Sequence, residues 1–200
     1  MRGVKALVTG GCRMDNGAGS YRRFLEGDDD SLSDLVREYR DGLMLFINTY
    51  VGNIAVAEDL TEDTFVKLVI KKPKFHGESS FKSWLYAIGR NAAIDYKRRA
   101  AREALVPFDV GERPDADDFV EKLENEYLRE DRKIALHRAM RGLKEEYRRI
   151  LWLVYFEELR YRDAAKVMGK TRRSVESLAY QARRALKDAL EKEGMDDEKL

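Results

Sequence analysis

The sequence predicts an all-α protein with two small helical domains, joined by an acidic linker, and a helix-turn-helix in the second domain. Three observations lead to this fold class. Apolar residues recur at helical spacing along most of the chain. Charged residues make up 38% of the sequence while the 44% hydrophobic share is not depleted, which is typical of amphipathic helices with charged outer faces. Finally, three prolines in 200 residues leave long stretches in which helices can continue.

Residues 1–30 are expected to form a disordered N-terminal tail. The segment from Gly10 to Gly19 is rich in glycine, and the weak apolar stretch before it does not resemble a signal peptide. Residues 1–13 are expected to be dispensable, so that a chain starting at Met14 folds as well as the full one. An acidic triplet at residues 28–30 precedes the first predicted helix, where carboxylates suit the positive end of the helix dipole.

Three helices are predicted in the first domain, over residues 31–102. The first follows the apolar periodicity over 31–50 and ends at a Val-Gly-Asn turn. The second ends at the Lys-Lys-Pro sequence at 71–73. The loop 74–80 then leads to the third helix, over 81–100, and a serine at the end of the loop can cap it.

The third helix carries two different faces. The residues predicted to pack in the core are Phe81, Leu85, Ile88, Ala92 and Tyr96, with Trp84 at the edge of this stripe. The residues predicted to lie on the opposite face are Lys82, Tyr86, Arg90 and Lys97. Asn91 lies at the border between the two faces. The core stripe is ordinary, whereas aromatic rings set among cations require a functional explanation.

Charge is sorted along the chain. Residues 67–102 hold ten Lys or Arg and two acidic residues, residues 103–131 hold eleven acidic and three basic residues, and residues 166–187 hold seven basic and one acidic. Charge runs are often solvated helix faces. Two basic blocks around an acidic one nevertheless favour a polyanionic partner. The acidic block also contains two prolines and few large apolar residues, which predicts a flexible linker.

The second domain is predicted over residues 132–192, followed by a short tail over 193–200. Its helix-turn-helix is indicated by a small residue, a turn glycine and two apolar residues at the required spacing, namely Ala165, Gly169, Val175 and Leu178. Thr171 can cap the second helix. The residues expected on its outer face are Arg172, Arg173, Glu176, Ser177, Tyr180 and Arg184. Such a face fits the DNA major groove, and the alternative is a plain helical hairpin with a solvated cationic face.

Several function classes are excluded or disfavoured. The single cysteine, Cys12, excludes an internal disulfide and fits a reducing cytoplasm. The two histidines, His76 and His137, lie far apart without zinc-type spacing, and no glycine-rich phosphate loop follows a predicted strand. We therefore expect no catalysis, metal or cofactor. No apolar run approaches membrane-spanning length, so membrane insertion is not expected.

The two domains together resemble a sigma factor of bacterial RNA polymerase, of the extracytoplasmic-function (ECF) group. The segment AEDLTEDTF, residues 57–65, is similar to the family's clamp-binding helix. Residues 75–99, FHGESSFKSWLYAIGRNAAIDYKRR, are similar to its promoter-melting and recognition segment. Residues 143–186 follow the domain that reads the upstream promoter element. The resemblance covers residues 31–102 and 132–191, and it implies core RNA polymerase, promoter DNA and, as in many members, an anti-sigma factor as partners.

The resemblance also implies the site residues. Those aligned with the polymerase-binding helix are Glu58, Asp59, Leu60, Glu62, Asp63 and Phe65. Those aligned with the downstream single-strand site are Phe75, His76, Glu78, Lys82, Trp84, Tyr86, Arg90, Asn91 and Lys97. The upstream site comprises the six outer residues of the last helix named above. Cations that follow phosphates and rings that accept unstacked bases are what a single strand needs, which explains the outer face of the third helix.

Within the downstream site, the loop 74–80 aligns with the family's pocket for a flipped base, and Trp84 is expected to be mostly buried. The sequence departs from the family pattern at three positions. Glu62 replaces a usual glutamine, and Glu176 and Gln181 stand where basic residues are frequent. These departures bear on the polymerase contact and on which promoter is read.

Three other classes compete with the resemblance: a stand-alone helix-turn-helix regulator that never binds polymerase, an enzyme, and a helical adaptor without a nucleic-acid role. The stand-alone regulator explains residues 162–190 but leaves the third helix and the AEDLTEDTF segment without a purpose. The adaptor requires both basic blocks to be incidental.

Overall fold

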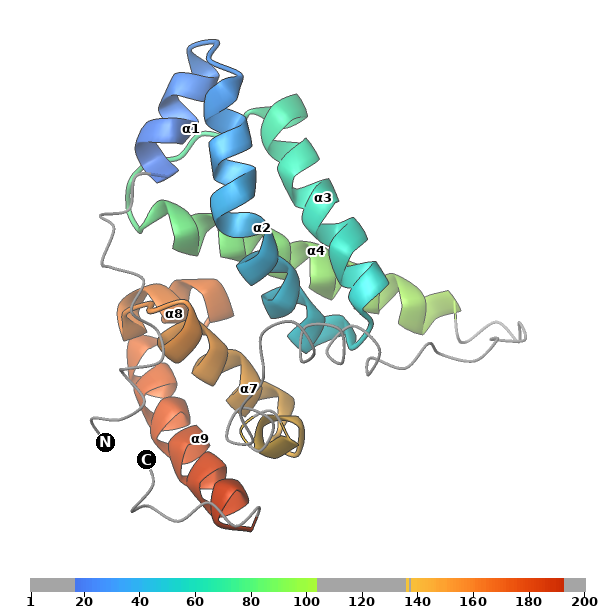
Figure 1. Ribbon diagram of the computed structural model, residues 1–200, viewed down its shortest axis with the longest axis vertical. Helices are drawn as coiled ribbons and strands as arrows, with labels where there is room; N and C mark the ends of the chain where they lie inside the picture. The colour runs from blue at the N-terminus through green and yellow to red at the C-terminus, as the bar shows by residue number, and fades with distance from the viewer. Residues whose placement is uncertain (1–16, 104–135, 137, 193–200) are drawn as a thin grey trace.

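The computed structural model describes residues 17–103, 136 and 138–192, and in these ranges it contains helices and loops without any β-strand (Figure 1). The predicted all-α fold class is confirmed. The predicted linker over 103–131 lies outside the described residues except for residue 103, and the predicted tail over 193–200 lies outside them entirely.

The first helix, α1 (Gly17–Leu25), corrects the expectation of a tail over residues 1–30. Tyr21 and Phe24 are buried on one side of it. Gly17 lies so close to α4 (Phe81–Glu103) that a Cβ there would stand 2.5 Å from the Phe81 ring. A nine-residue helix is unstable alone, so its stability comes from this packing. Sequence periodicity carried no signal because only about two turns are formed.

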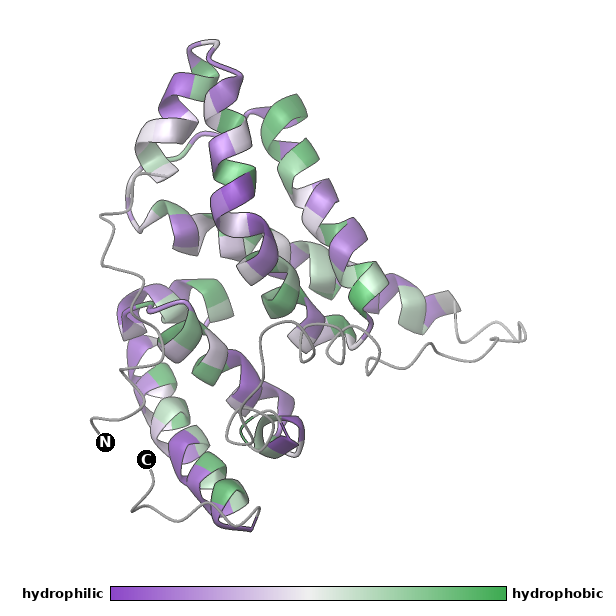
Figure 2. Ribbon diagram, in the orientation of Figure 1, coloured by the Kyte–Doolittle hydropathy of each residue, from purple (hydrophilic) through white to green (hydrophobic). Residues whose placement is uncertain are grey.

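The three helices predicted in the first domain are confirmed as α2 (Asp30–Val51), α3 (Ile54–Lys71) and α4. Their ends have specific partners. The backbone N–H of Ser31 donates to Asp28 Oδ1 at 3.4 Å, and that of Ser83 donates to Ser80 Oγ at 3.1 Å. α2 ends at Gly52, whose φ of 66° needs the left-handed region that glycine adopts freely. Figure 2 shows hydrophilic and hydrophobic residues alternating along these helices, as expected for amphipathic elements.

The core of the first domain lies where α2 crosses α3 and α4. Leu43, Ile47 and Leu85 are fully buried there. Gly89 allows the close approach of α4 to α2, because a Cβ at this position would lie 2.8 Å from Leu43 Cδ1. At the start of α4 a cluster of aromatic rings completes the core; its members are Tyr21, Phe75, Phe81 and Trp84, with centroids 5.3–5.7 Å apart.

The second domain is built from α7 (Glu145–Leu151), the π-helical turn η2 (Trp152–Phe156), α8 (Tyr161–Met168) and α9 (Arg172–Lys192). The predicted helix-turn-helix is confirmed in α8 and α9. Gly169 ends α8 with a φ of 63°, and Thr171 caps α9 by accepting the Ser174 N–H at 3.2 Å. Ala165 and Val175 are buried where the two helices meet.

The two domains pack directly against each other. α4 contacts α8, and α2 contacts α7. In Figure 1 the first domain lies above and the second below, with α8 next to the N-terminal part of α4. Apolar periodicity specifies each domain separately but carries no information on this arrangement, which depends on individual polar pairs described below.

Candidate nucleic-acid interface

The cations of the predicted downstream site point toward the second domain. Lys82 Nζ lies 2.8 Å from Glu157 Oε2 and also donates to the Glu157 carbonyl oxygen at 3.3 Å. Lys97 Nζ lies 3.8 Å from Glu145 Oε2. The Arg90 guanidinium abuts the turn of the helix-turn-helix, because a Cβ on Gly169 would be 3.1 Å from its Nη2. These three cations therefore lie on the predicted outer face of α4, and the second domain packs against that face.

Tyr86 corrects the face assigned to it. Its ring is fully buried, and its centroid lies 5.3 Å from that of the Phe46 ring. Tyr86 therefore does not lie on the outer surface of α4. Burial raises the pKa of Tyr86 well above its usual value, and the negative charge of Glu157 adds to this effect. A base cannot stack on this ring while the two domains are packed as they are.

The remaining downstream residues lie at or beside the loop before α4. Phe75 is half-buried, 5.4 Å from the ring of Trp84, and Trp84 is itself half-buried in the aromatic cluster. His76 and Glu78 are exposed on the loop, which turns at Gly77 with a φ of 74°. Asn91 is exposed on α4. The loop thus adjoins the N-terminal end of α4, whereas Asn91 lies in the middle of that helix.

Glu157 is a residue that sequence reasoning missed. Its side chain is only 9% exposed, and it accepts hydrogen bonds from Lys82 and, at 3.2 Å, from Trp152 Nε1. It follows η2, where the π-helical turn and the stacked rings of Trp152 and Phe156, 4.6 Å apart, set its direction. In the sequence it is one of two adjacent glutamates, and no pattern distinguishes it from Glu158.

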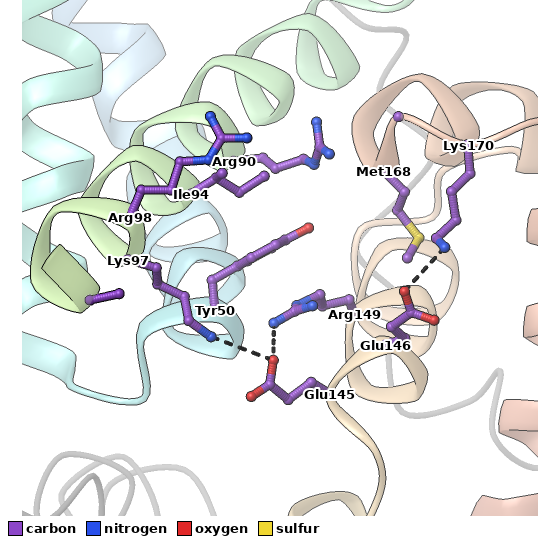
Figure 3. Close-up of a pocket in the computed structure, with 12 residues that line it drawn as sticks. Tyr50, Arg90, Ile94, Lys97, Arg98, Glu145, Glu146, Arg149, Met168 and Lys170 are labelled. Carbon is purple, nitrogen blue, oxygen red and sulfur yellow. Dashed lines mark hydrogen bonds and ion pairs between the residues drawn. The ribbon is translucent and has the colours of Figure 1, made fainter. Parts of the chain in front are cut away.

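A cavity of about 540 Å³ between the two domains is rich in cations (Figure 3). The cations that line it are Arg90, Lys97, Arg98, Arg149 and Lys170. Two carboxylates from α7 offset part of this charge: Glu145 pairs with Lys97 and Arg149, and Glu146 lies 3.1 Å from Lys170 Nζ. The cavity wall keeps an excess of positive charge.

Arg149 joins the two domains beside this cavity. Its guanidinium carbon lies 3.8 Å from the centroid of the Tyr50 ring, in cation–π geometry, and its Nη2 donates to the Thr49 carbonyl oxygen at 3.3 Å. Burial raises the pKa of Tyr50, and the charge of Arg149 opposes that rise. Arg149 therefore ties α7 to the end of α2.

The predicted upstream residues lie together on the outside of α9. Arg172, Arg173, Ser177 and Arg184 are exposed, and Tyr180 is 57% exposed. Glu176 is half-buried because it pairs with Arg172 across one helical turn, 2.8 Å from Nε to Oε1. A shallow groove of about 430 Å³ runs along this face beside Arg173 and Ser177. This surface is open to solvent.

The predicted polymerase-binding helix is α3, where the structure separates two groups of residues. Glu58, Asp59, Glu62 and Asp63 are exposed, and Glu58 pairs with Arg40. Leu60 and Phe65 are buried in the core, so they hold α3 in place from inside the domain. Sequence reasoning missed three exposed apolar residues on the same outer face, which are Val66, Val69 and Ile70. Their helical spacing from Glu62 was the signal that could have identified them.

None of the helices in the described ranges combines the length and the apolar character that a membrane span requires. Within the same ranges no three or more His, Cys, Asp or Glu side chains are grouped as metal ligands.

A cationic helix face in one domain and an exposed helix-turn-helix in the other define a two-domain DNA-binding protein. Residues 35–103 match the family model of Sigma-70 region 2, and residues 133–186 match that of Sigma-70, region 4. The RNA polymerase sigma-H factor of Pseudomonas aeruginosa is 30% identical, over 84% of this chain and 91% of that protein. The ECF RNA polymerase sigma factor SigM of Bacillus subtilis is 27% identical, over 84% and 99%. The chain belongs to the RNA polymerase sigma factors, in the ECF group.

Solved structures show the same fold. The sigma factor RpoE from Bartonella quintana, in complex with the anti-sigma factor NepR, has a TM-score of 0.61 at 24% identity, covering 80% of this chain and 96% of that one. CnrH, in complex with the cytosolic domain of CnrY, has a TM-score of 0.59 at 20% identity, covering 89% and 98%.

Proposed function

We propose that this protein binds core RNA polymerase and directs it to specific promoters, where the first domain holds the melted downstream strand and the second reads the upstream element. The observation that carries the proposal is the presence, in one chain, of a cationic α4 face and an exposed recognition surface on α9. A reader of duplex DNA needs only the second surface. A protein that both locates a promoter and holds it open needs both.

The upstream element is read by α9 in the major groove. Arg173 and Ser177 lie in its first two turns, where side chains of a recognition helix reach base edges. Glu176 is held by Arg172, and its second oxygen can accept a hydrogen bond from a cytosine amino group. Arg184, further along the helix, faces the phosphate backbone. The predicted departure at Glu176 is thus a candidate determinant of promoter choice.

The downstream element is held as a single strand. Lys82, Arg90 and Lys97 follow one face of α4, so they can track successive phosphates without reading sequence. The exposed loop residues His76 and Glu78, next to the Phe75 ring, supply edge and stacking contacts for one extruded base. The helix is therefore proposed to contribute affinity for any strand, and the loop to contribute the preference for one base.

Core polymerase is bound by the outer face of α3. Four carboxylates there adjoin three exposed apolar side chains, of which Ile70 is 74% exposed. An acidic surface with an apolar centre suits a basic partner surface with complementary apolar residues. Glu62, which stands where the family usually has glutamine, lies in this face, so the replacement bears directly on the proposed polymerase contact.

The remaining proposals concern setting and partners. A cytoplasmic location follows from the proposed partners, and the chemistry of RNA synthesis belongs to the polymerase. An anti-sigma factor is a further proposed partner, because both solved structures of similar fold described above hold such an inhibitor or a cytosolic partner domain. A stand-alone helix-turn-helix regulator is not favoured, since it gives no role to α3 or to the α4 cations.

The test is transcription reconstituted from purified components. Core polymerase with this protein is expected to start transcripts at specific sites on genomic DNA of its own host, whereas core polymerase alone starts none there. A chain in which Glu58, Glu62 and Asp63 are replaced by lysine serves as the control for polymerase binding. Absence of any site-specific stimulation by the unaltered protein would rule out the proposed function.

A further inference from the structure

We propose that the cationic cavity between the two domains is a binding site for a small anion that carries two or more phosphate groups, such as a diphosphate. This site lies beyond the function proposed above, since it concerns a ligand of the protein alone and requires neither promoter DNA nor polymerase. Three properties of the cavity support it: the excess of positive charge on the wall, the way in which one partly buried cation is held, and the volume.

The wall of the cavity carries more cations than carboxylates. The cations are Arg90, Lys97, Arg98, Arg149 and Lys170, and the carboxylates are Glu145 and Glu146. Five cations less two carboxylates leave an excess of three positive charges. Two phosphate groups carry about three negative charges near pH 7. A diphosphate therefore matches the excess charge, whereas a carboxylate or a single phosphate leaves part of it uncompensated.

The cations reach the cavity from both domains (Figure 3). Arg90 and Arg98 come from α4, Arg149 comes from α7, and Lys170 follows the turn at Gly169. Cations on facing walls suit an anion with charged oxygens at both ends, because each end can contact a different wall. A strand that follows α4 needs the cations of that helix alone. Arg149 and Lys170 are therefore donors for which the proposed strand contact has no use.

Arg149 is held in place before any ligand binds. Its side chain is 12% exposed, its guanidinium carbon lies 3.8 Å from the centroid of the Tyr50 ring, and its Nη2 donates to the Thr49 carbonyl oxygen. Its Nε is buried without a hydrogen-bond partner among the described residues. Its carboxylate partner, Glu145, is about half exposed and also faces Lys97. A guanidinium that is largely removed from water and only partly compensated favours a further anion nearby.

Arg90 and Lys170 supply donors that a phosphate can use. Arg90 Nη1 donates to the uncharged Asn91 side chain at 3.4 Å, which leaves the charge of the guanidinium in place. Lys170 Nζ lies 3.1 Å from Glu146 Oε1 in a pair that is partly exposed. Phosphate and carboxylate oxygens accept the same N–H donors, and arginine offers two of them in parallel. A diphosphate therefore competes with Glu146 for Lys170.

The volume and the surroundings of the cavity fit a small ligand. About 540 Å³ lies within the usual range of small-ligand pockets, roughly 300–1,000 Å³. Ile94 and Met168 add apolar side chains to the wall, and surrounding protein strengthens the interactions of the charged groups because it excludes water. The groove on α9, by contrast, is shallow and lies along a single helix, as suits the phosphates of a duplex.

Isothermal titration calorimetry of the full chain with inorganic pyrophosphate tests the site. We expect one pyrophosphate per chain and an affinity at least about tenfold higher than that for orthophosphate, because the second phosphate group reaches cations that the first cannot. Adenosine diphosphate is the second probe, since the same group occurs in nucleotides. Equal or tighter binding of adenosine diphosphate would assign the site to nucleotides, and weaker binding would assign it to an inorganic diphosphate.

Two changes of charge in the wall should move the pyrophosphate affinity in opposite directions. Lys170→Gln removes a donor and should weaken binding about tenfold. Glu146→Gln removes the competing carboxylate and should tighten binding about threefold, an effect that damage to the fold would not produce. Lys192→Gln is the matched control for loss of one positive charge, because Lys192 is exposed at the end of α9, away from the cavity, and it should leave the affinity unchanged. Circular dichroism checks that each variant is folded.

Two results would overturn the site. Pyrophosphate that binds no more tightly than orthophosphate, or at several equivalents per chain, would show a general attraction of anions to surface cations. Equal losses of affinity in Lys170→Gln and Lys192→Gln would place the binding outside the cavity. Because the titration contains neither polymerase nor DNA, a negative result would leave the proposed function standing, and a failure to initiate transcription would leave the anion site standing.

Discussion

The buried phenol side chain of Tyr21 joins α1 to the segment that leads into α4. The ring is 1% exposed and lies 5.4 Å from Phe81, and its hydroxyl donates to the Pro73 carbonyl oxygen at 2.8 Å. Burial raises the pKa of Tyr21 to about 12, because ionisation would place a charge among aromatic rings. The aromatic cluster that supports the loop before α4 thus depends on a neutral tyrosine.

This shift predicts the response to alkaline pH. The unfolded chain ionises Tyr21 near the usual tyrosine pKa of 10.0, whereas the folded protein retains the proton up to about 12. The unfolded state therefore binds fewer protons in this interval, and the free energy of unfolding should fall by about 1.4 kcal/mol per pH unit from this residue. Tyr21→Phe should be less stable at pH 7, having lost one hydrogen bond worth about 1 kcal/mol, but should show a shallower alkaline decline. Urea unfolding at pH 8, 10 and 11 measures both, and identical slopes would contradict the assignment.

At the scale of elements, α9 separates packing from recognition by helical periodicity. Val175, Ala179 and Ala182 are buried against α7 and α8, while Arg173 and Ser177 lie on the opposite side. The turn glycine, Gly169, fixes the angle between α8 and α9. Because small buried residues hold α9 close to the domain, its outer face projects as a single surface.

We therefore expect Arg173→Ala to weaken binding to duplex DNA carrying the upstream element by about 1–3 kcal/mol, the usual value of a base contact. Its effect on a single-stranded downstream oligonucleotide should be negligible, since Arg173 is exposed on α9 and belongs to the other domain. Lys192→Ala, at the other end of the same helix, is the matched control for loss of one positive charge. Equal losses of affinity for both DNA substrates would show that the two promoter elements are not recognised by separate domains.

At the scale of the whole molecule, sequence predicted the elements better than their arrangement. α2, α3, α4 and the helix-turn-helix follow from apolar spacing and from turn and cap residues such as Gly52 and Thr171. α1 was missed because a nine-residue helix depends on tertiary contacts at Gly17 and Tyr21 rather than on its own periodicity. Tyr86 was placed on the wrong face because a helical wheel cannot foresee that α2 also packs beside it.

The candidate site shows the same limit. The cations of α4 and the outer residues of α9 could be identified as two basic surfaces from sequence alone, because charge and helical spacing are local properties. The packing of the two domains against each other could not be predicted from sequence. The pairing of Lys82 with Glu157 joins residues 75 positions apart, and nothing near either residue indicates the other. The interface between the domains is therefore a property of the folded chain.

This arrangement predicts how salt affects strand binding by the whole protein. A strand that displaces Glu157 and Glu145 from Lys82 and Lys97 releases its own counterions, but the freed carboxylates take up cations in exchange. Added salt also weakens the exposed ion pair between Lys97 and Glu145, and so favours separation of the two domains. The slope of log affinity against log salt should therefore be shallower for the unaltered protein than for Glu157→Gln, by about 0.7 for each phosphate contact offset in this way. Fluorescence anisotropy of one labelled oligonucleotide at four salt concentrations gives both slopes, with Glu158→Gln as the control that should match the unaltered protein. Parallel lines for the unaltered protein and Glu157→Gln would mean that the carboxylates of the second domain do not compete with the strand.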